Sequence, residues 1–565
     1  MGILKFSIFM VSVLFMVPRP ASSSSPDHEK TPEEILAGMS TEQKVGQLMM
    51  VGFGGKKMGP EIKALVKGLH VGAVALYSRN IHDIWQVKRL VSDLRKAMRT
   101  EIQPFIAIDQ EGGNVVRIHS RVSVLPGSMT LGATRDPVLA FLAGQAQGVD
   151  LQMVGLNMNL APVLDTNINP KNPVINVRAF GEKASLVAQM GTAFIHGQQM
   201  AGLTTVAKHF PGHGSTTRDS HFSLPRITLS REKLFKTELL PFRKAVEAGL
   251  DAIMTAHIEV PAFEKDGTPA SLSHEIITEL LRKRMGFNGL VITDDLEMRA
   301  ISAGRGVGPS AVRAILAGAD MVMVIWTPSK KKEVFRDLLK AVETNTISQK
   351  RLDRSVLRIL RLKAKRGVLS SFDSGVNSLT ELSHLPNRLH SQITRNIAIR
   401  GITLVKNKDS LLPLCGDKRL LVISPYKLFR QEMSRLLPGS TLESISLVSS
   451  KARREAELNR LIHKASEHDV IVIGATNVYQ AWLVQQLQHK IKIPMVVVSF
   501  GSPYLLRYFP RVAAYLCTYS YQASAMVAAA RAIAGQHSIT GRLPVSLGTR
   551  YPSGRGLMLR RRQCK

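Results

Sequence analysis

Short runs of apolar, largely β-branched residues alternate with helical stretches between residues 48 and 325, and this alternation constrains the fold more than any other feature. The runs are Leu48–Val51, Val71–Leu76, Phe105–Ile108, Leu156–Leu160, Thr204–Ala207, Ala252–Thr255, Leu290–Thr293 and Met321–Ile325. Strands that alternate with helices form parallel sheets, either closed into a (β/α)8 barrel or open and doubly wound. The pattern therefore predicts an α/β fold.

The position of the polar residues favours the barrel over the open sheet. Asp109, Asp165, Lys208-His209, His257 and Asp294 each come at or just after the end of a predicted strand. Barrel sites are assembled from the carboxyl ends of many strands, whereas an open sheet concentrates them at one switch point. We therefore expect a TIM-type barrel over residues 26–369, with its site at the carboxyl ends of the strands.

A second unit is predicted after the barrel. Residues 370–386 are polar and turn-rich and are predicted to form a linker. Five further apolar runs follow, at Ile402–Val405, Leu420–Ser424, Val470–Gly474, Met495–Ser499 and Ala514–Leu516. They predict a smaller α/β sandwich domain with a parallel sheet over residues 387–550, followed by a basic tail over 551–565.

The N-terminus and the overall charge bear on location and partners. The first 26 residues contain no acid; Lys5 precedes the apolar run Phe6–Val17, and small residues follow at Ala21–Ser25. This pattern is typical of a secretory signal peptide over residues 1–25, with export to the periplasm or the exterior, although an uncleaved interfacial anchor is an alternative. The net charge of +32 favours association with an anionic cell wall or membrane surface. The sequence contains no basic stripe interleaved with aromatic residues, so we expect no specific nucleic-acid partner.

The stretch from Lys208 to His221 holds the densest group of titratable side chains. Asp219 lies two residues before His221, where a carboxylate can accept the ring N–H and prepare the histidine for proton transfer. A loop-stabilising hydrogen bond is the alternative. A zinc site is disfavoured because Pro211 and Gly212 break any helix that would align His209 with a second histidine.

Carboxylates at two other predicted strand ends complete the candidate site. Asp294 and Asp295 follow Leu290–Thr293, and one of them is placed to attack a substrate or to stabilise a cation, with a helix N-cap pair as the alternative. Asp109 and Arg117 offer an acceptor and a fork of donors, or alternatively a structural salt bridge. Only three cysteines occur, which argues against a disulfide scaffold.

Together these segments resemble glycoside hydrolase family 3, and within it the NagZ-type β-N-acetylglucosaminidases. The resemblance rests on Asp109–Gly113 with Arg117, Ala161–Asp165, Asn172–Ile175 with Arg178–Gly181, Lys208–Gly214, Asp219–His221 and Thr293–Leu296. In the second domain it rests on Leu404–Asn407, Leu411–Leu414, Gly501–Pro503 and Gly541–Pro544.

The resemblance implies retaining hydrolysis of terminal β-linked N-acetylglucosamine, with peptidoglycan fragments as the expected substrate. It implies that Asp294 is the nucleophile and that His221, oriented by Asp219, is the acid/base. The family pattern assigns sugar binding to Asp109, Arg117, Arg178, Lys208 and His209, and requires no metal or other cofactor. A relative that cleaves β-glucosides and a non-enzymatic cell-wall-binding protein are the alternatives. The intact Asp219-Ser-His221 segment argues against the first, and its occurrence together with Asp294 argues against the second.

Overall fold

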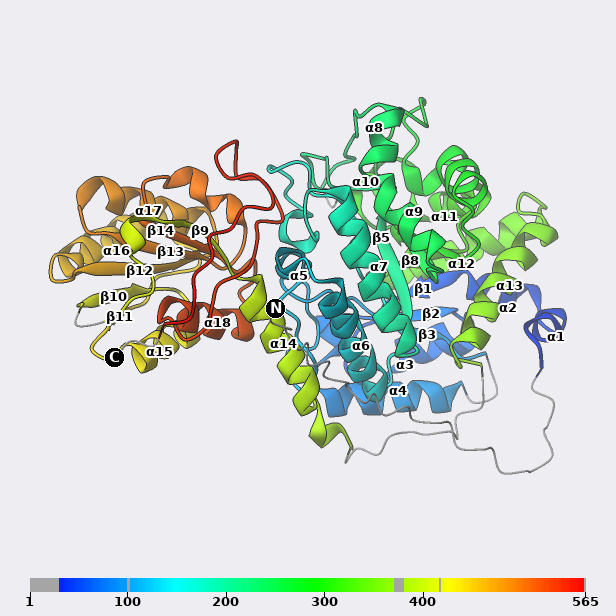
Figure 1. Ribbon diagram of the computed structural model, residues 1–565. Coiled ribbons are helices and arrows are strands. Elements are labelled where there is room, and N and C mark those ends of the chain that lie inside the picture. Colours follow the sequence, from blue (N-terminus) through cyan, green and yellow to red (C-terminus); the bar gives the residue numbers. More distant parts are fainter. Residues whose placement is uncertain (1–29, 99–101, 221, 370–380, 416–417, 563–565) are drawn as a thin grey trace, which may run out of the picture.

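A computed structural model describes residues 30–98, 102–220, 222–369, 381–415 and 418–562. The predicted signal peptide, residues 370–380 of the predicted linker, and His221 lie outside the described residues. Two lobes are visible, with the larger one formed by the N-terminal part of the chain (Figure 1). In the described part of the chain, no helix is long and apolar enough to cross a membrane.

The larger lobe is a closed barrel of eight parallel strands in sequence order, sealed by pairing between β1 and β8. The strands are β1 (Met49–Val51), β2 (Ala73–Leu76), β3 (Phe105–Ile108), β4 (Met158–Asn159), β5 (Thr204–Phe210), β6 (Ala252–Thr255), β7 (Leu290–Asp295) and β8 (Met321–Val324). Almost all of their side chains are buried, as expected for strands covered by helices. The predicted barrel is confirmed, with β5 and β7 extending past the predicted ends.

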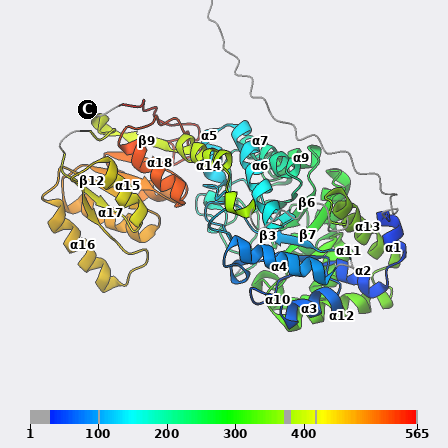
Figure 2. The same cartoon turned by 90° about the horizontal axis from the view of Figure 1, so that it is seen from below.

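Helices surround the barrel (Figures 1 and 2). They are α1 (Pro32–Ala37), α2 (Thr41–Gln47), α3 (Pro60–Lys63), α4 (Ile84–Ala97), α5 (Ser128–Thr134), α6 (Pro137–Val154), α7 (Ala184–Met200), α8 (Arg231–Lys236), α9 (Leu239–Glu247), α10 (Arg299–Arg305), α11 (Val307–Ala317), α12 (Pro328–Glu343) and α13 (Gln349–Lys365). Shorter helical turns are η1 (Ala64–Gly68), η2 (Ser78–Asn80), η3 (Asn176–Arg178), η4 (Ala270–Leu272) and the π-helix η5 (Glu275–Arg284).

The smaller lobe contains a six-stranded sheet in the order β11-β10-β12-β13-β14-β9. Its strands are β9 (Thr403–Asn407), β10 (Leu420–Ile423), β11 (Thr441–Glu443), β12 (Val470–Ala475), β13 (Met495–Ser499) and β14 (Ala514–Cys517). Its helices are α14 (Arg388–Gly401), η7 (Lys408–Ser410), α15 (Lys427–Leu436), α16 (Lys451–Ala465), α17 (Val478–Lys490), η8 (Pro503–Tyr508) and α18 (Ala523–Ile533). The preceding turn η6 (Glu381–His384) packs on the barrel, because Leu382 belongs to the barrel core.

Two predictions about this lobe were wrong. The sheet is mixed rather than parallel, because β9 pairs antiparallel with β14. The predicted boundary at residue 550 is not an edge of the lobe, since Leu557 bridges Leu404 and Leu559 bridges Ile539. The apolar residues of the basic tail therefore pair with the lobe. Cys415 is disulfide-bonded and Cys517 is a buried thiol.

The two lobes are joined by hydrogen bonds to loops at the carboxyl end of the barrel. The Asn167 side chain, in the loop after β4, donates to the Tyr504 hydroxyl of η8 at 3.0 Å. The backbone N–H of Ser546 donates to the Glu182 carboxylate at 2.7 Å. The smaller lobe thus supports the segment between β4 and α7, which carries Arg178.

Candidate active site

Four of the predicted sugar-binding residues meet in one network of ion pairs at the carboxyl ends of β3 and β5. Arg117 Nη2 lies 2.8 Å from Asp109 Oδ2, and Lys208 Nζ donates to the other oxygen of the same carboxylate. Lys208 Nζ also lies 2.7 Å from Glu111 Oε1. Arg178 donates to both oxygens of Glu111, at 2.9 and 2.7 Å. The network fixes three cationic side chains, each with its donors beside a carboxylate.

Glu111 links this network together, and the sequence interpretation did not assign it a role. It is 5% exposed. Burial favours its neutral form, but Arg178 and Lys208 hold the pKa of its carboxyl well below the usual range. Its position two residues after Asp109 could have indicated a shared role, because residues i and i+2 of an extended chain point to the same side.

The neighbouring carboxyls Asp294 and Asp295, at the end of β7, have pKa values shifted in opposite directions. Burial favours the neutral acid at Asp294, but His257, His209 and Lys208 bring its pKa below the usual value. Burial raises the pKa of Asp295 to about 7, and the charges of Glu297 and Asp294 act in the same direction. The lower pKa of Asp294 is consistent with the predicted nucleophile, because two neighbouring carboxyls whose pKa values are pushed apart can take different roles.

His257 supports this pair from β6. It is fully buried; its Nδ1 lies 2.7 Å from the Ser271 hydroxyl and its Nε2 lies 3.0 Å from the backbone oxygen of Asp295. His257 therefore holds the backbone at the end of β7 through its contact with the Asp295 oxygen.

His209, the fifth predicted binding residue, lies at the end of β5 and is tied to Asp165. Its Nδ1 lies 2.7 Å from Asp165 Oδ2, and the other Asp165 oxygen accepts the backbone N–H of His213 at 2.7 Å. Asp165 is fully buried. Burial favours its neutral form, but His209 lowers the pKa of its carboxyl. A carboxylate bonded to one ring nitrogen fixes the orientation of the ring and leaves Nε2 as the other functional atom.

The loop that carries Asp219 is held against the barrel on its inner side. Asn172 donates to the backbone oxygen of His213 at 2.7 Å, and Thr216 Oγ1 lies 2.8 Å from His213 Nδ1. A Cβ added to Gly214 would lie 1.8 Å from the backbone oxygen of Thr166, so only glycine fits there. Asp219 is half-buried at the outer part of the loop. The predicted pairing of Asp219 with His221 stays a prediction, because His221 lies outside the described residues.

Two aromatic rings at the ends of β2 and β8 form a wall next to this network. Tyr77 and Trp326 have ring centroids 5.3 Å apart, and the Arg117 guanidinium lies 5.2 Å from the Tyr77 centroid. Trp326 is 54% exposed. Neither aromatic residue was predicted, because a single tyrosine or tryptophan after a strand has no distinctive pattern.

Among the residues that the structure describes, no three His, Cys, Asp or Glu side chains form a group that could hold a metal ion.

Known proteins with a similar sequence and structure share this architecture. Residues 40–362 match the model of the glycosyl hydrolase family 3 N-terminal domain. Beta-hexosaminidase A of Pseudoalteromonas piscicida is 30% identical, in an alignment that covers 90% of this chain and 97% of the relative. A beta-N-acetylglucosaminidase/beta-glucosidase of Cellulomonas fimi is 27% identical, with 90% and 94% covered.

Among solved structures, a glycoside hydrolase family 3 beta-N-acetylglucosaminidase from Paenibacillus sp. str. FPU-7 superposes with a TM-score of 0.84 at 36% identity. That superposition covers 90% of this chain and 99% of the other. The family-model match spans most of the barrel and more than half of the chain, and these relatives extend the likeness through the second lobe. The chain belongs to glycosyl hydrolase family 3.

Proposed function

We propose that this glycoside hydrolase is a retaining exo-β-N-acetylglucosaminidase. The observation that carries the proposal is the Asp294 carboxyl at the end of β7, whose pKa is held below its usual value by His257, His209 and Lys208 beside the less acidic Asp295. A retaining glycosidase needs such a carboxylate in its charged form to attack the anomeric carbon. The similarity to the Pseudoalteromonas beta-hexosaminidase A and the Paenibacillus beta-N-acetylglucosaminidase supports the choice of sugar.

In the proposed reaction, Asp294 forms a covalent bond to the anomeric carbon while His221 protonates the leaving oxygen. Asp219 orients the histidine, which then takes a proton from the water that releases the sugar. Five side chains hold the hydroxyl and acetamide groups of the sugar: Asp109, Arg117, Arg178, Lys208 and His209. Their ion pairs with Asp109, Glu111 and Asp165 support this role, because donors that are already fixed by carboxylates need little reorganisation when the sugar binds.

We further propose that the enzyme is exported through residues 1–25 and acts on peptidoglycan fragments. The acid-free, apolar N-terminus supports export. The net charge of +32 supports association with an anionic wall polymer or membrane surface.

Hydrolysis of chromogenic β-N-acetylglucosaminide and β-glucoside by the purified chain tests the activity. We expect a higher kcat/KM for the N-acetylglucosaminide, and NMR of the first product should show the β-anomer. Preference for the glucoside would favour the second candidate, a β-glucosidase, which the name of the Cellulomonas relative supports. An α-anomer as the first product would contradict the covalent mechanism.

The role of His221 is tested with leaving groups of different acidity. A His221→Ala variant should lose about 10²–10⁴-fold in kcat/KM on a substrate with a poor leaving group and much less on one with a nitrophenyl leaving group, because the latter needs little protonation. Equal losses on both substrates would contradict the acid/base role. The His196→Ala variant, altered on the outer helix α7, is the control and should match the wild type.

A further inference from the structure

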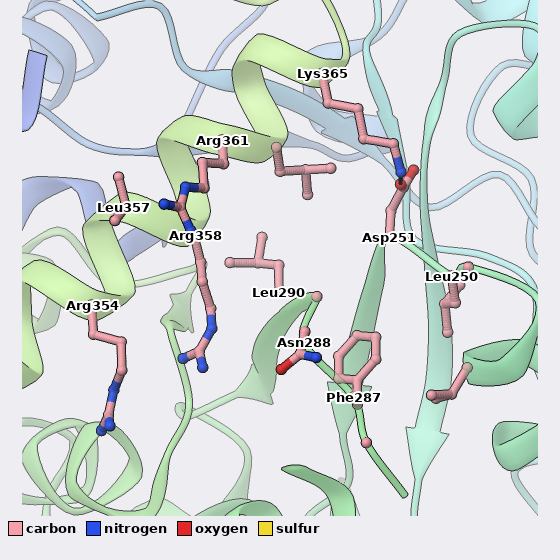
Figure 3. Close-up of a pocket in the computed structure, with 15 residues that line it drawn as sticks. Leu250, Asp251, Phe287, Asn288, Leu290, Arg354, Leu357, Arg358, Arg361 and Lys365 are labelled. Atoms are coloured by element: carbon pink, nitrogen blue, oxygen red, sulfur yellow. Dashed lines mark hydrogen bonds and ion pairs between the residues drawn. The ribbon is translucent and has the colours of Figure 1, made fainter. Parts of the chain in front are cut away.

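A cavity of about 580 Å³ lies at the end of the barrel opposite the active site. Its lining includes Asp251 and Gly289, which immediately precede β6 and β7, together with one side of α13 (Figure 3). All barrel strands are parallel, so the residues that precede them lie at the amino ends and the catalytic residues at the carboxyl ends. The volume is in the range of small-molecule sites.

One wall of the cavity is cationic. Arg354, Arg358, Arg361 and Lys365 follow each other on α13 at spacings of three or four residues, which places them on one side of the helix. Figure 3 shows Arg354 and Arg358 extending from α13 in the same direction, with Asn288 on the side of Arg358. Arg354 is exposed and forms no ion pair with any residue that the structure describes.

The other lining cations are only partly neutralised. Arg358 lies 3.2 Å from Asp320, Arg361 lies 2.7 Å from Glu33, and Lys365 lies 3.0 Å from Asp251. Arg361 and Lys365 remain 62% and 57% exposed.

Cations outnumber carboxylates at this end of the barrel. Its cationic side chains are Arg282, Arg351, Arg354, Arg358, Arg361, Lys365 and Arg366, and the carboxylates paired with them are Glu33, Asp251 and Asp320. Arg282, Arg351 and Arg366 also bond to backbone carbonyls and are held in the protein. The excess charge therefore lies on the cavity side, where it favours an anion.

The wall that faces α13 is apolar. It is formed by Leu250, Phe287 and Leu290, whereas Leu357 and Leu362 lie among the cationic residues of α13 itself. A ligand that uses both walls has an anionic group at one end and an apolar part at the other. Several guanidinium groups around one space match a phosphate better than a carboxylate, because phosphate offers more oxygens and more charge.

We propose that this cavity binds a phosphate-bearing amphiphile, with the phosphate against Arg354 and Arg358 and the apolar part against Leu250, Phe287 and Leu290. The same chemistry is present in the phosphate of a membrane lipid and in a soluble phosphate ester. The site would bind the chain to such a ligand while the catalytic end faces the opposite direction.

Calorimetric titration of the full chain with octyl phosphate, below its micelle concentration, tests the site. We expect saturable binding of one molecule per chain, about tenfold weaker in Arg354→Gln and unchanged in Arg336→Gln, which removes the same charge from the exposed side of α12. Leu250→Ala should weaken octyl phosphate but leave inorganic phosphate unchanged. Equal binding by the wild type and Arg354→Gln, or absence of saturable binding, would overturn the proposal. Octanoate binding as tightly as octyl phosphate would overturn the choice of phosphate.

Vesicles distinguish the two sources. Phosphatidylcholine vesicles with and without phosphatidic acid are sedimented with the wild type, Arg354→Gln and Arg336→Gln. Sedimentation that depends on phosphatidic acid and is lost only in Arg354→Gln supports a lipid phosphate. Octyl phosphate binding without such a difference supports a soluble ester.

Discussion

The two ends of the barrel are built from the same kinds of side chain, and they differ in which charge is in excess. At the carboxyl end, the acidic side chains of the site outnumber its arginines and lysines. The acidic residues are Asp109, Glu111, Asp165, Asp294 and Asp295, and the basic residues are Arg117, Arg178 and Lys208. At the amino end, arginines and lysines outnumber the carboxylates. The carboxyl end suits a transition state with positive charge on the sugar, whereas the amino end suits an anion.

The comparison separates two uses of a carboxylate next to a barrel strand, fully buried at Asp320 and half-buried at Asp294. Asp320, before β8, has both oxygens bonded to protein groups, with Ser355 Oγ at 2.6 Å and the Val291 backbone N–H at 3.1 Å. Asp294 Oδ1 accepts the backbone N–H of Asp295 at 2.8 Å. Nearby histidines and Lys208 lower the pKa of the Asp294 carboxyl. The first arrangement stabilises the fold, and the second leaves the carboxylate able to react.

The largest effect is expected at Asp294. Asp294→Asn should lower kcat by at least about 10³-fold, because the amide is nearly isosteric but cannot form the glycosyl ester. Circular dichroism should remain that of the wild type. Asp295→Asn is the matched control and should lose much less, since its carboxyl has a pKa raised to about 7. Equal losses in the two variants would contradict the assignment of the nucleophile.

At the opposite end, the change is expected in stability rather than in activity. Asp320→Asn leaves the buried Arg282 and the half-buried Arg358 without their counter-charge and should lower the free energy of unfolding by about 3–5 kcal/mol. Its kcat/KM should be unchanged below the unfolding transition. Urea denaturation at pH 7 measures the effect. Asp353→Asn, which removes a more exposed partner of Lys44, should cost less than about 1 kcal/mol. A kcat/KM loss in Asp320→Asn without unfolding would show that the two ends are not independent.

The sequence allowed the barrel to be predicted because buried parallel strands are short, apolar and separated by helices. The convergence of strand ends also placed Asp109, Arg117 and Lys208 in one site, and the family resemblance added Arg178. Glu111 was not recognised, because its role depends on reaching Arg178 from another loop. The antiparallel direction of β9 and the cavity beside α13 also depend on packing between distant segments, which local periodicity does not encode.

Glu238 gives a pH test of the carboxyl end. It is fully buried before α9, against Gly212 of the loop that leads to Asp219. Burial raises its pKa from 4.5 to about 8, and the charge of Asp165 adds to the effect. The folded state therefore holds a proton that the unfolded state has lost. The contribution to stability is fully present below pH 4.5 and falls as the pH rises toward 8.

Glu238→Gln should remove this dependence, which reaches up to about 1.4 kcal/mol per pH unit. Urea unfolding at pH 5.5, 7 and 8.5 should give a wild-type stability that falls relative to the variant. Glu232→Gln, an exposed change on α8, should follow the wild type. Parallel curves for the wild type and Glu238→Gln would show that the carboxyl is already ionised in the folded protein.

The smallest effect is expected at Glu111, because it positions the binding side chains and does not itself react. In Glu111→Gln, the amide oxygen can still accept from Arg178, and Lys208 keeps its pair with Asp109, so the network loosens without losing all its contacts. We expect KM to rise about tenfold, roughly 1.4 kcal/mol, with a smaller change in kcat. Glu259→Gln, at a long 3.9 Å ion pair with Arg226, is the control. A loss confined to kcat would mean that Glu111 acts on the transition state, and the carboxylate excess at this end would then include a further catalytic group.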